Sequence, residues 1–156
     1  MHIRLIAVGE RQPAWVDEAV AAYTSRLPPA WRFRIDPVAA ARRVKNAPPK
    51  GALRDESAAI LSRLGTGERM ILLDERGREL TSREFSGRLA DWQGEGRDVA
   101  FVIGGPDGVA ADCRERAEFT WSLSKLTLPH GLARVVFAEQ LYRAATLLSG
   151  HPYHRD

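Results

Sequence analysis

Three short segments of this chain are apolar almost without interruption, and they limit the possible folds more than any other feature. They are Ile3–Val8, Arg69–Asp74 and Val99–Ile103. A strand with one face in solvent alternates apolar and polar residues, whereas a strand covered on both faces does not. Segments with helical spacing separate the three runs. We therefore predict an α/β fold, in which a mostly parallel sheet carries helices on both of its faces.

Weaker signals complete the expected order of elements. Two further strands are expected at Phe33–Val38 and Phe119–Leu123. Thr81, with Glu84 three residues later, has the spacing of a capping box at the start of a helix. The length of 156 residues suits a single domain, residues 1–156. The expected helices cover residues 14–27, 48–64, 82–92, 112–117 and 132–148, with Trp15, Ala19, Ala22 and Tyr23 on the inner face of the first.

Composition excludes several classes of protein. No apolar run approaches the roughly 20 residues of a membrane span, and the segment Met1–Gly9 lacks the features of a signal peptide. Cys113 is the only cysteine, which fits a reducing cytoplasm and argues against a structural zinc site. We expect a cytoplasmic protein with no metal and no membrane contact. The net charge of +3 permits nucleic-acid binding without requiring it.

The expected final helix carries two apolar stripes rather than one. Such a helix must be buried on most of its sides. A symmetric homodimer, in which a partner subunit covers the second stripe, is the simpler explanation, and complete burial within one domain is the alternative. The stripes are Leu132, Val135, Val136 and Tyr142, and then Phe137, Leu141, Ala144 and Leu148.

A long polar loop runs from Ala39 to Gly51. It carries four basic residues, Arg42, Arg43, Lys45 and Lys50. The pattern is typical of a solvated, mobile connection, and it also suits contact with an RNA backbone. The two interpretations are compatible, because mobile basic loops often close on phosphates.

A glycine turn, Gly104–Gly108, follows one apolar strand, and Leu72–Asp74 ends its expected neighbour. The turn matches neither the dinucleotide fingerprint nor the phosphate-binding P-loop, so it is either a tight turn or a ligand loop. Ligands of parallel sheets bind in the crevice between such strand ends. The segment Leu123–Leu128 is an edge strand or a loop that presents backbone groups and leucines to a flat heterocycle.

The chain ends on polar and aromatic groups, His151, Tyr153, His154 and Arg155. A frayed tail is one interpretation, but an aromatic residue there favours docking. His130, between a proline and a glycine, is expected to cap or pack, with a ligand or catalytic role as the less favoured alternative. No triad order and no metal-ligand spacing is convincing.

Four segments together closely resemble the RlmH family, bacterial methyltransferases that modify N3 of a pseudouridine in 23S ribosomal RNA. The resemblance covers the whole chain, and only the combination of segments makes it specific. Two positions depart mildly from the family pattern: Asp107, where relatives often have glutamate, and Gly131, where some have proline. The four segments are residues 103–108, 121–130, 138–144 and 153–155.

This resemblance implies a SPOUT-type fold with a C-terminal trefoil knot, a homodimer, and S-adenosylmethionine as methyl donor held in the knot. Nothing in the periodicity of the sequence reveals a knot, which is rare among folds. The expected crevice and the family's donor pocket coincide. The donor contacts that the family's motifs imply are Leu73, Gly104, Leu123, Ser124, Lys125, Leu126, Thr127 and Leu128.

We hypothesise that the tail carries the catalytic groups and reaches over the donor pocket of the partner subunit. His154 would remove the N3 proton or orient a water that does. Arg155 would stabilise the imide anion or hold a phosphate, and Tyr153 would position the pseudouridine ring by stacking. The expected substrate is 23S rRNA within assembled ribosomes. The alternatives are a non-enzymatic, ribosome-binding assembly factor and a methyltransferase of the same fold that acts on transfer RNA.

Overall fold

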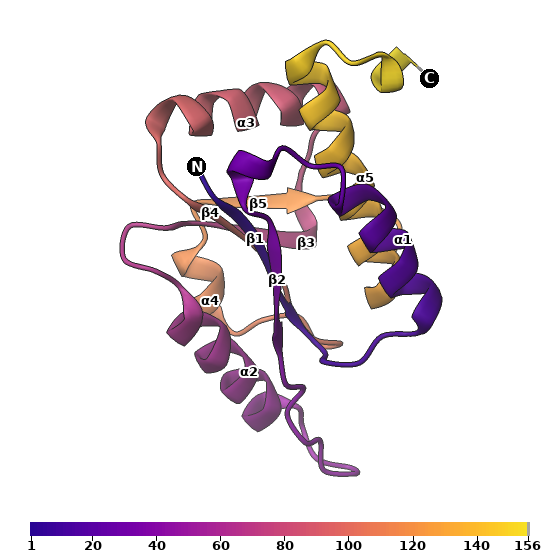
Figure 1. Cartoon of the computed structure of the whole chain (residues 1–156). Coiled ribbons are helices and arrows are strands. Elements are labelled where there is room, and N and C mark those ends of the chain that lie inside the picture. The colour runs from indigo at the N-terminus through magenta and orange to yellow at the C-terminus, as the bar shows by residue number, and fades with distance from the viewer. Residues whose placement is uncertain (156) are drawn as a thin grey trace.

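The computed structural model describes residues 1–155, except for the side chain of His154. Its centre is a five-stranded sheet in the order β2-β1-β4-β3-β5, and all neighbouring strands are parallel (Figure 1). This confirms the predicted α/β fold. The trefoil knot stays a prediction. The strands are β1 (Ile3–Val8), β2 (Arg34–Val38), β3 (Arg69–Glu79), β4 (Val99–Ile103) and β5 (Phe119–Ser122).

Helices cover both faces of the sheet, as expected. In Figure 1, α1, α3 and α5 lie on one side and α2 and α4 on the other. Among residues 1–155, no helix is long and apolar enough to cross a membrane. The helices are α1 (Ala14–Thr24), α2 (Lys50–Arg63), α3 (Ser82–Glu95), α4 (Ala111–Arg116) and α5 (His130–Ser149), with short 3₁₀ turns at Pro29–Trp31 and Pro152–Arg155.

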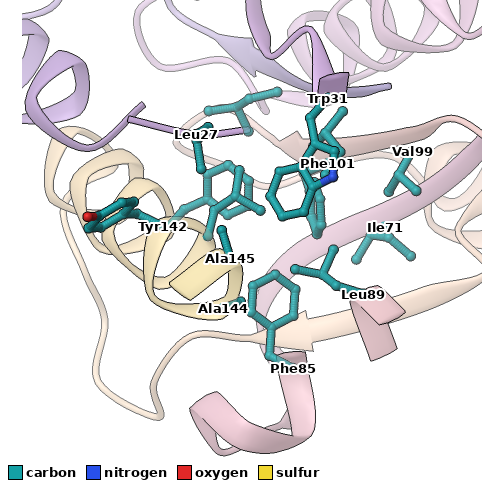
Figure 2. Packing of buried hydrophobic residues seen from close by; sticks show 14 of the residues in the cluster. Leu27, Trp31, Ile71, Phe85, Leu89, Val99, Phe101, Tyr142, Ala144 and Ala145 are labelled. Carbon is teal, nitrogen blue, oxygen red and sulfur yellow. The ribbon is translucent and has the colours of Figure 1, made fainter. Parts of the chain in front are cut away.

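Two cores, one on each face, explain why the central strands are largely apolar. Along β1, Leu5 points into the core beneath α3 and α5, and Ile6 points into the core beneath α2 and α4. In the larger core the ring of Phe101 lies 6.0 Å from that of Phe85 and 4.8 Å from that of Phe137 (Figure 2). Each fully buried side chain of this size contributes about 1.5–3 kcal/mol.

The predicted inner face of α1 is right for Ala19 and Tyr23, which are half-buried, and wrong for Trp15 and Ala22. Val16 and Val20 are buried, while Trp15 is 54% exposed and Ala22 is also exposed. The reason is that α1 packs on Ala138 of α5 rather than directly on the sheet. Small and branched side chains suit this close approach of two helices, and the large indole of Trp15 is left outside.

The two stripes of α5 are covered unequally. Phe137, Leu141 and Ala144 are fully buried in the core. The other stripe is covered in part by the same chain, because Val135 packs beside α1 and Tyr142 is only 7% exposed. Leu132 and Leu148 remain 37% and 41% exposed. The described chain therefore accounts for much of the apolar surface of α5, and the homodimer stays a prediction.

β3 is longer than expected because it continues past a bulge. Leu73 pairs with Trp121 of β5, the register then shifts, and Arg78 pairs with the same Trp121. Gly77 lies in the bulge, where a Cβ atom would come within 2.6 Å of the carbonyl oxygen of Thr120. Only glycine allows β3 and β5 to approach so closely. The bulge, residues 74–77, projects from the sheet at the end of the apolar run.

Candidate functional site

A cavity of about 390 Å³ opens where β4 ends beside the bulge of β3. Leu73 and Ile103 are paired in register there, so the apolar part of β3 and the strand β4 end side by side. Three segments surround the cavity: the bulge 74–77, the glycine turn Gly104–Gly108 and the loop Leu123–Leu128 that follows β5. The volume falls within the range of small-molecule sites, about 300–1,000 Å³. The expected crevice between neighbouring strand ends is therefore present.

The glycine turn brings backbone groups, as well as Pro106 and Asp107, to the cavity wall. The amide of Gly108 donates a hydrogen bond to the carbonyl of Gly105 over 3.0 Å, and Gly108 has a φ of +81°. A Cβ atom on Gly104 would lie 2.6 Å from the carbonyl oxygen of Gly108. A side chain has no room at Gly104 and would strain the backbone at Gly108, so a ligand can reach the peptide groups at these positions.

The structure brings together seven of the eight expected donor contacts. Lys125 is the exception: it is 86% exposed and its ammonium lies 3.4 Å from a carboxylate oxygen of Glu79. The seven that line the cavity are Leu73, Gly104, Leu123, Ser124, Leu126, Thr127 and Leu128.

The segment that follows β5 is a loop and not an edge strand. The hydroxyl of Ser124 accepts a hydrogen bond from the amide of Leu126 at 3.0 Å. This local bond replaces the pairing that a strand would require. The backbone of the loop is therefore free to face a ligand.

Two carboxylates hold the bulge in place. Asp74 accepts hydrogen bonds from the backbone of Arg76 and from the guanidinium of Arg114, both over 2.9 Å. Burial acts to raise the pKa of Asp74, but hydrogen bonds from the side chain and backbone of Arg76 and from Arg114 outweigh it and lower the pKa to about 2. The hydroxyl of Thr127 donates to Glu75 over 2.9 Å. The bulge is thus tied to α4 on one side and to the loop on the other.

His130, the first residue of α5, contributes to the cavity wall. Burial lowers the pKa of this histidine, and the nearby guanidinium of Arg134 lowers it further. The ring is therefore neutral at physiological pH. Among residues 1–155 its Nε2 atom is buried without a hydrogen-bond partner. A neutral ring does not repel a cationic ligand.

The C-terminal tail is docked rather than frayed. The hydroxyl of Tyr153 donates a hydrogen bond to Glu139 over 3.0 Å, and its ring lies 4.7 Å from that of Tyr142. Burial and the bond to Glu139 raise the pKa of Tyr153 to about 12. Arg155 is exposed, and the side chain of His154, the expected base, lies outside the described residues. Docking of the tail depends on Tyr153.

The tail and the cavity of one subunit lie at opposite ends of α5. His130 begins the helix beside the cavity, and Tyr153 follows its last turn (Figure 1). A helix of 20 residues is about 30 Å long. The structure therefore does not bring the expected catalytic residues to the expected donor contacts within one chain.

Several residues of the cavity wall were not expected from the sequence. The bulge supplies two charged residues that had not been singled out, Glu75 and Arg76. Gly77 is the one sequence signal that marks the bulge. Among residues 1–155 there is no cluster of three or more His, Cys, Asp or Glu that is suited to hold a metal ion.

Comparisons with known proteins agree with this architecture. The family model described as "Predicted SPOUT methyltransferase" matches residues 1–154. A protein of Thioalkalivibrio sulfidiphilus named ribosomal RNA large subunit methyltransferase H is 48% identical over 156 residues, which is all of both chains. A protein of the same name from Hydrogenovibrio crunogenus is 46% identical, again over both whole chains.

Solved structures share the fold at lower identity. A probable methyltransferase from Bordetella pertussis has a TM-score of 0.56 at 20% identity and covers 92% of this chain and 94% of its own. A structure reported for the 2-OH methylation of C/U34 on tRNA has a TM-score of 0.53 at 17% identity and covers 96% and 98%. By the family model and the full-length relatives, the chain belongs to the SPOUT methyltransferases and, within them, to the family of ribosomal RNA large subunit methyltransferase H.

Proposed function

We propose that this protein transfers a methyl group from S-adenosylmethionine to N3 of a pseudouridine in 23S ribosomal RNA. The observation that carries the proposal is the cavity at the ends of β3 and β4, which is lined by seven residues at the positions of the family's donor contacts. The full-length relatives at 46–48% identity support ribosomal RNA as the substrate. A ribosomal substrate also supports a cytoplasmic location.

The chemistry of the cavity suits this donor. The loop Leu123–Leu128 offers backbone groups and leucine side chains to an adenine ring. Neutral His130 and the carboxylate of Glu75 tolerate a positive charge between them. The donor supplies a methyl carbon that is already activated by the positive sulfur, so the reaction needs no metal.

We propose that the working site combines two subunits, because the tail lies about one helix length from the cavity of its own chain. In a homodimer the tail of one copy closes over the cavity of the other. Trp15 and Leu132 are exposed near the starts of α1 and α5, where Val16 packs against Gly131. These two apolar side chains suit a contact with the second copy.

In this proposal the imide nitrogen attacks the methyl carbon, the carbon–sulfur bond breaks, and the N3 proton passes to a base. Alignment of the two reactants contributes about 7–11 kcal/mol, and a positioned base adds about 10²–10⁴-fold. His154 accepts the proton or orients a water that does, and Arg155 stabilises the imide anion. Tyr153, whose pKa is about 12, stays protonated and positions the pseudouridine ring.

Two other functions make different predictions. A non-enzymatic assembly factor would bind ribosomes without tight binding of the donor. A transfer-RNA methyltransferase of the same fold would bind the donor and modify a different RNA. Below 25% identity the solved structures support only the shared fold, so they do not favour the second alternative.

Calorimetric titration with S-adenosylmethionine, followed by methylation of 70S ribosomes and mass mapping of the RNA, tests the proposal. We expect saturable donor binding and one methylated pseudouridine in 23S rRNA. Absence of donor binding would refute the enzymatic function, and methylation of transfer RNA alone would refute the substrate.

A further inference from the structure

One arginine joins three segments beside the cavity. Arg43, in the basic loop 39–49, donates hydrogen bonds to both carboxylate oxygens of Glu56 in α2, at 2.6 and 3.0 Å. Two nitrogens of the same guanidinium also donate to one oxygen of Asp107, both at 3.1 Å. Asp107 belongs to the glycine turn and lines the cavity. The basic loop is therefore linked directly to the turn.

Glu56 anchors one end of this link, because its carboxylate is buried in the fold. Its side chain is only 1% exposed, and it also accepts a hydrogen bond from the amide of Ala41 at 2.9 Å. A buried carboxylate requires such partners. Gly105 lies directly against it, because a Cβ atom there would come within 2.6 Å of a carboxylate oxygen. The next residue of α2, Ser57, accepts from the amide of Ala110 at 2.8 Å just beyond the turn.

The link also changes the interpretation of the basic loop. Arg43 faces inward, so the loop is anchored at this residue and is not a free connection. Arg42 and Lys45 on either side are exposed, and no ion pair engages them within residues 1–155. Two exposed cations thus flank the arginine that links the basic loop to Asp107 in the cavity wall.

We propose that Arg43 is a positioning residue that couples the basic loop to the donor-binding turn. When the donor orders the turn, the bond to Asp107 orders the loop and presents Arg42 and Lys45 to the RNA backbone. This inference rests on the proposed function, because it assumes that the turn binds S-adenosylmethionine.

A double-mutant cycle measures the coupling through the affinity for S-adenosylmethionine. The first change is Asp107→Asn. The second is the pair Arg43→Gln with Glu56→Gln, which removes the link without leaving a buried charge unpaired. We expect Asp107→Asn to raise the donor Kd about fivefold in the otherwise unchanged protein, as expected for a partly exposed ion pair. In the Gln/Gln background it should have almost no further effect.

The matched control is Arg54→Gln, which removes one exposed cation from α2 outside the link. It should leave the donor Kd unchanged. Equal effects of Asp107→Asn in both backgrounds would overturn the proposal, because Asp107 would then act on the donor directly. Thermal unfolding of each variant separates a change in Kd from loss of the fold.

Limited digestion with trypsin tests the loop itself, since Arg42 and Lys45 are cleavage sites. We expect S-adenosylmethionine to slow cleavage at these sites in the unchanged protein and not in the Gln/Gln variant. Equal donor protection of both proteins would refute the coupling while leaving the proposed function intact. Failure of the unchanged protein to bind S-adenosylmethionine would instead refute the proposed function.

Discussion

Gly104→Ala tests whether the glycine turn is shaped for backbone contact with the donor. The added Cβ atom would lie 2.6 Å from the carbonyl oxygen of Gly108 and 2.8 Å from a methyl group of Val109. The first neighbour is backbone, which cannot rotate away, so the turn itself must shift. Overpacking of this kind costs about 1–3 kcal/mol.

If the donor binds only the original conformation of the turn, its free energy of binding becomes less favourable by the same amount. At about 1.4 kcal/mol for each factor of ten, the donor Kd should rise by about tenfold or more. The assay is calorimetric titration with S-adenosylmethionine, with thermal unfolding measured in parallel.

Gly87→Ala is the matched control. Gly87 lies on the exposed side of α3, where a Cβ atom meets nothing within 4 Å. This change should stabilise the helix by about 0.5–1 kcal/mol and leave the donor Kd unchanged. An unaltered donor Kd in a folded Gly104→Ala protein would refute the argument that the turn carries donor binding.

Three further predictions concern stability and the tail. Asp74→Asn should lower the free energy of unfolding by about 2 kcal/mol at pH 7, because the hydrogen bonds lower the pKa of Asp74 to about 2. In the unchanged protein this stability is present above pH 4 and is lost as the pH falls towards 2. Urea unfolding at several pH values measures it. Thr81→Ala should cost about 1 kcal/mol in thermal unfolding through loss of the capping box, and an unchanged melting temperature would contradict the cap. Deletion of residues 153–156 should leave donor binding nearly intact and abolish methylation of ribosomes, and methylation at the normal rate would show that the tail is not catalytic.

The sheet was predictable because a strand buried on both faces leaves a clear pattern. Ile3–Val8, apart from Arg4, and Val99–Ile103 are apolar, and both are strands with the predicted bounds. The start of α3 was predictable for a local reason, since the side chains of Thr81 and Glu84 each accept a hydrogen bond from the other's backbone amide. Such features depend on neighbours in the sequence.

Features that depend on distant contacts were not predictable. The bulge after Leu73 exists because β3 and β5 pair in two registers, and only Gly77 marks it in the sequence. The inner face of α1 was misplaced at Trp15, which is apolar but 54% exposed. Arg43 resembles its basic neighbours, and only the fold brings it to Glu56 and Asp107.

The donor site was predicted in outline from strand ends and in detail from the family resemblance. The crevice between Leu73 and Gly104 follows from parallel strands that end side by side. The strand pattern does not predict which residues form the cavity wall, because Asp107 and His130 reach it through turns whose direction no local pattern specifies. Lys125 shows the converse, since it lies within the expected segment yet points to Glu79.

The most direct test of the central claim mixes two impaired variants, at a donor concentration low enough that Gly104→Ala alone shows little methylation. One carries Gly104→Ala and keeps its tail, and the other lacks residues 153–156 and keeps its cavity. If a site combines the cavity of one subunit with the tail of the other, each mixed dimer contains one complete site. Random exchange of subunits should then restore methylation to about a quarter of the normal rate. No restored methylation, when differently tagged subunits are shown to have exchanged, would contradict a site shared between two subunits.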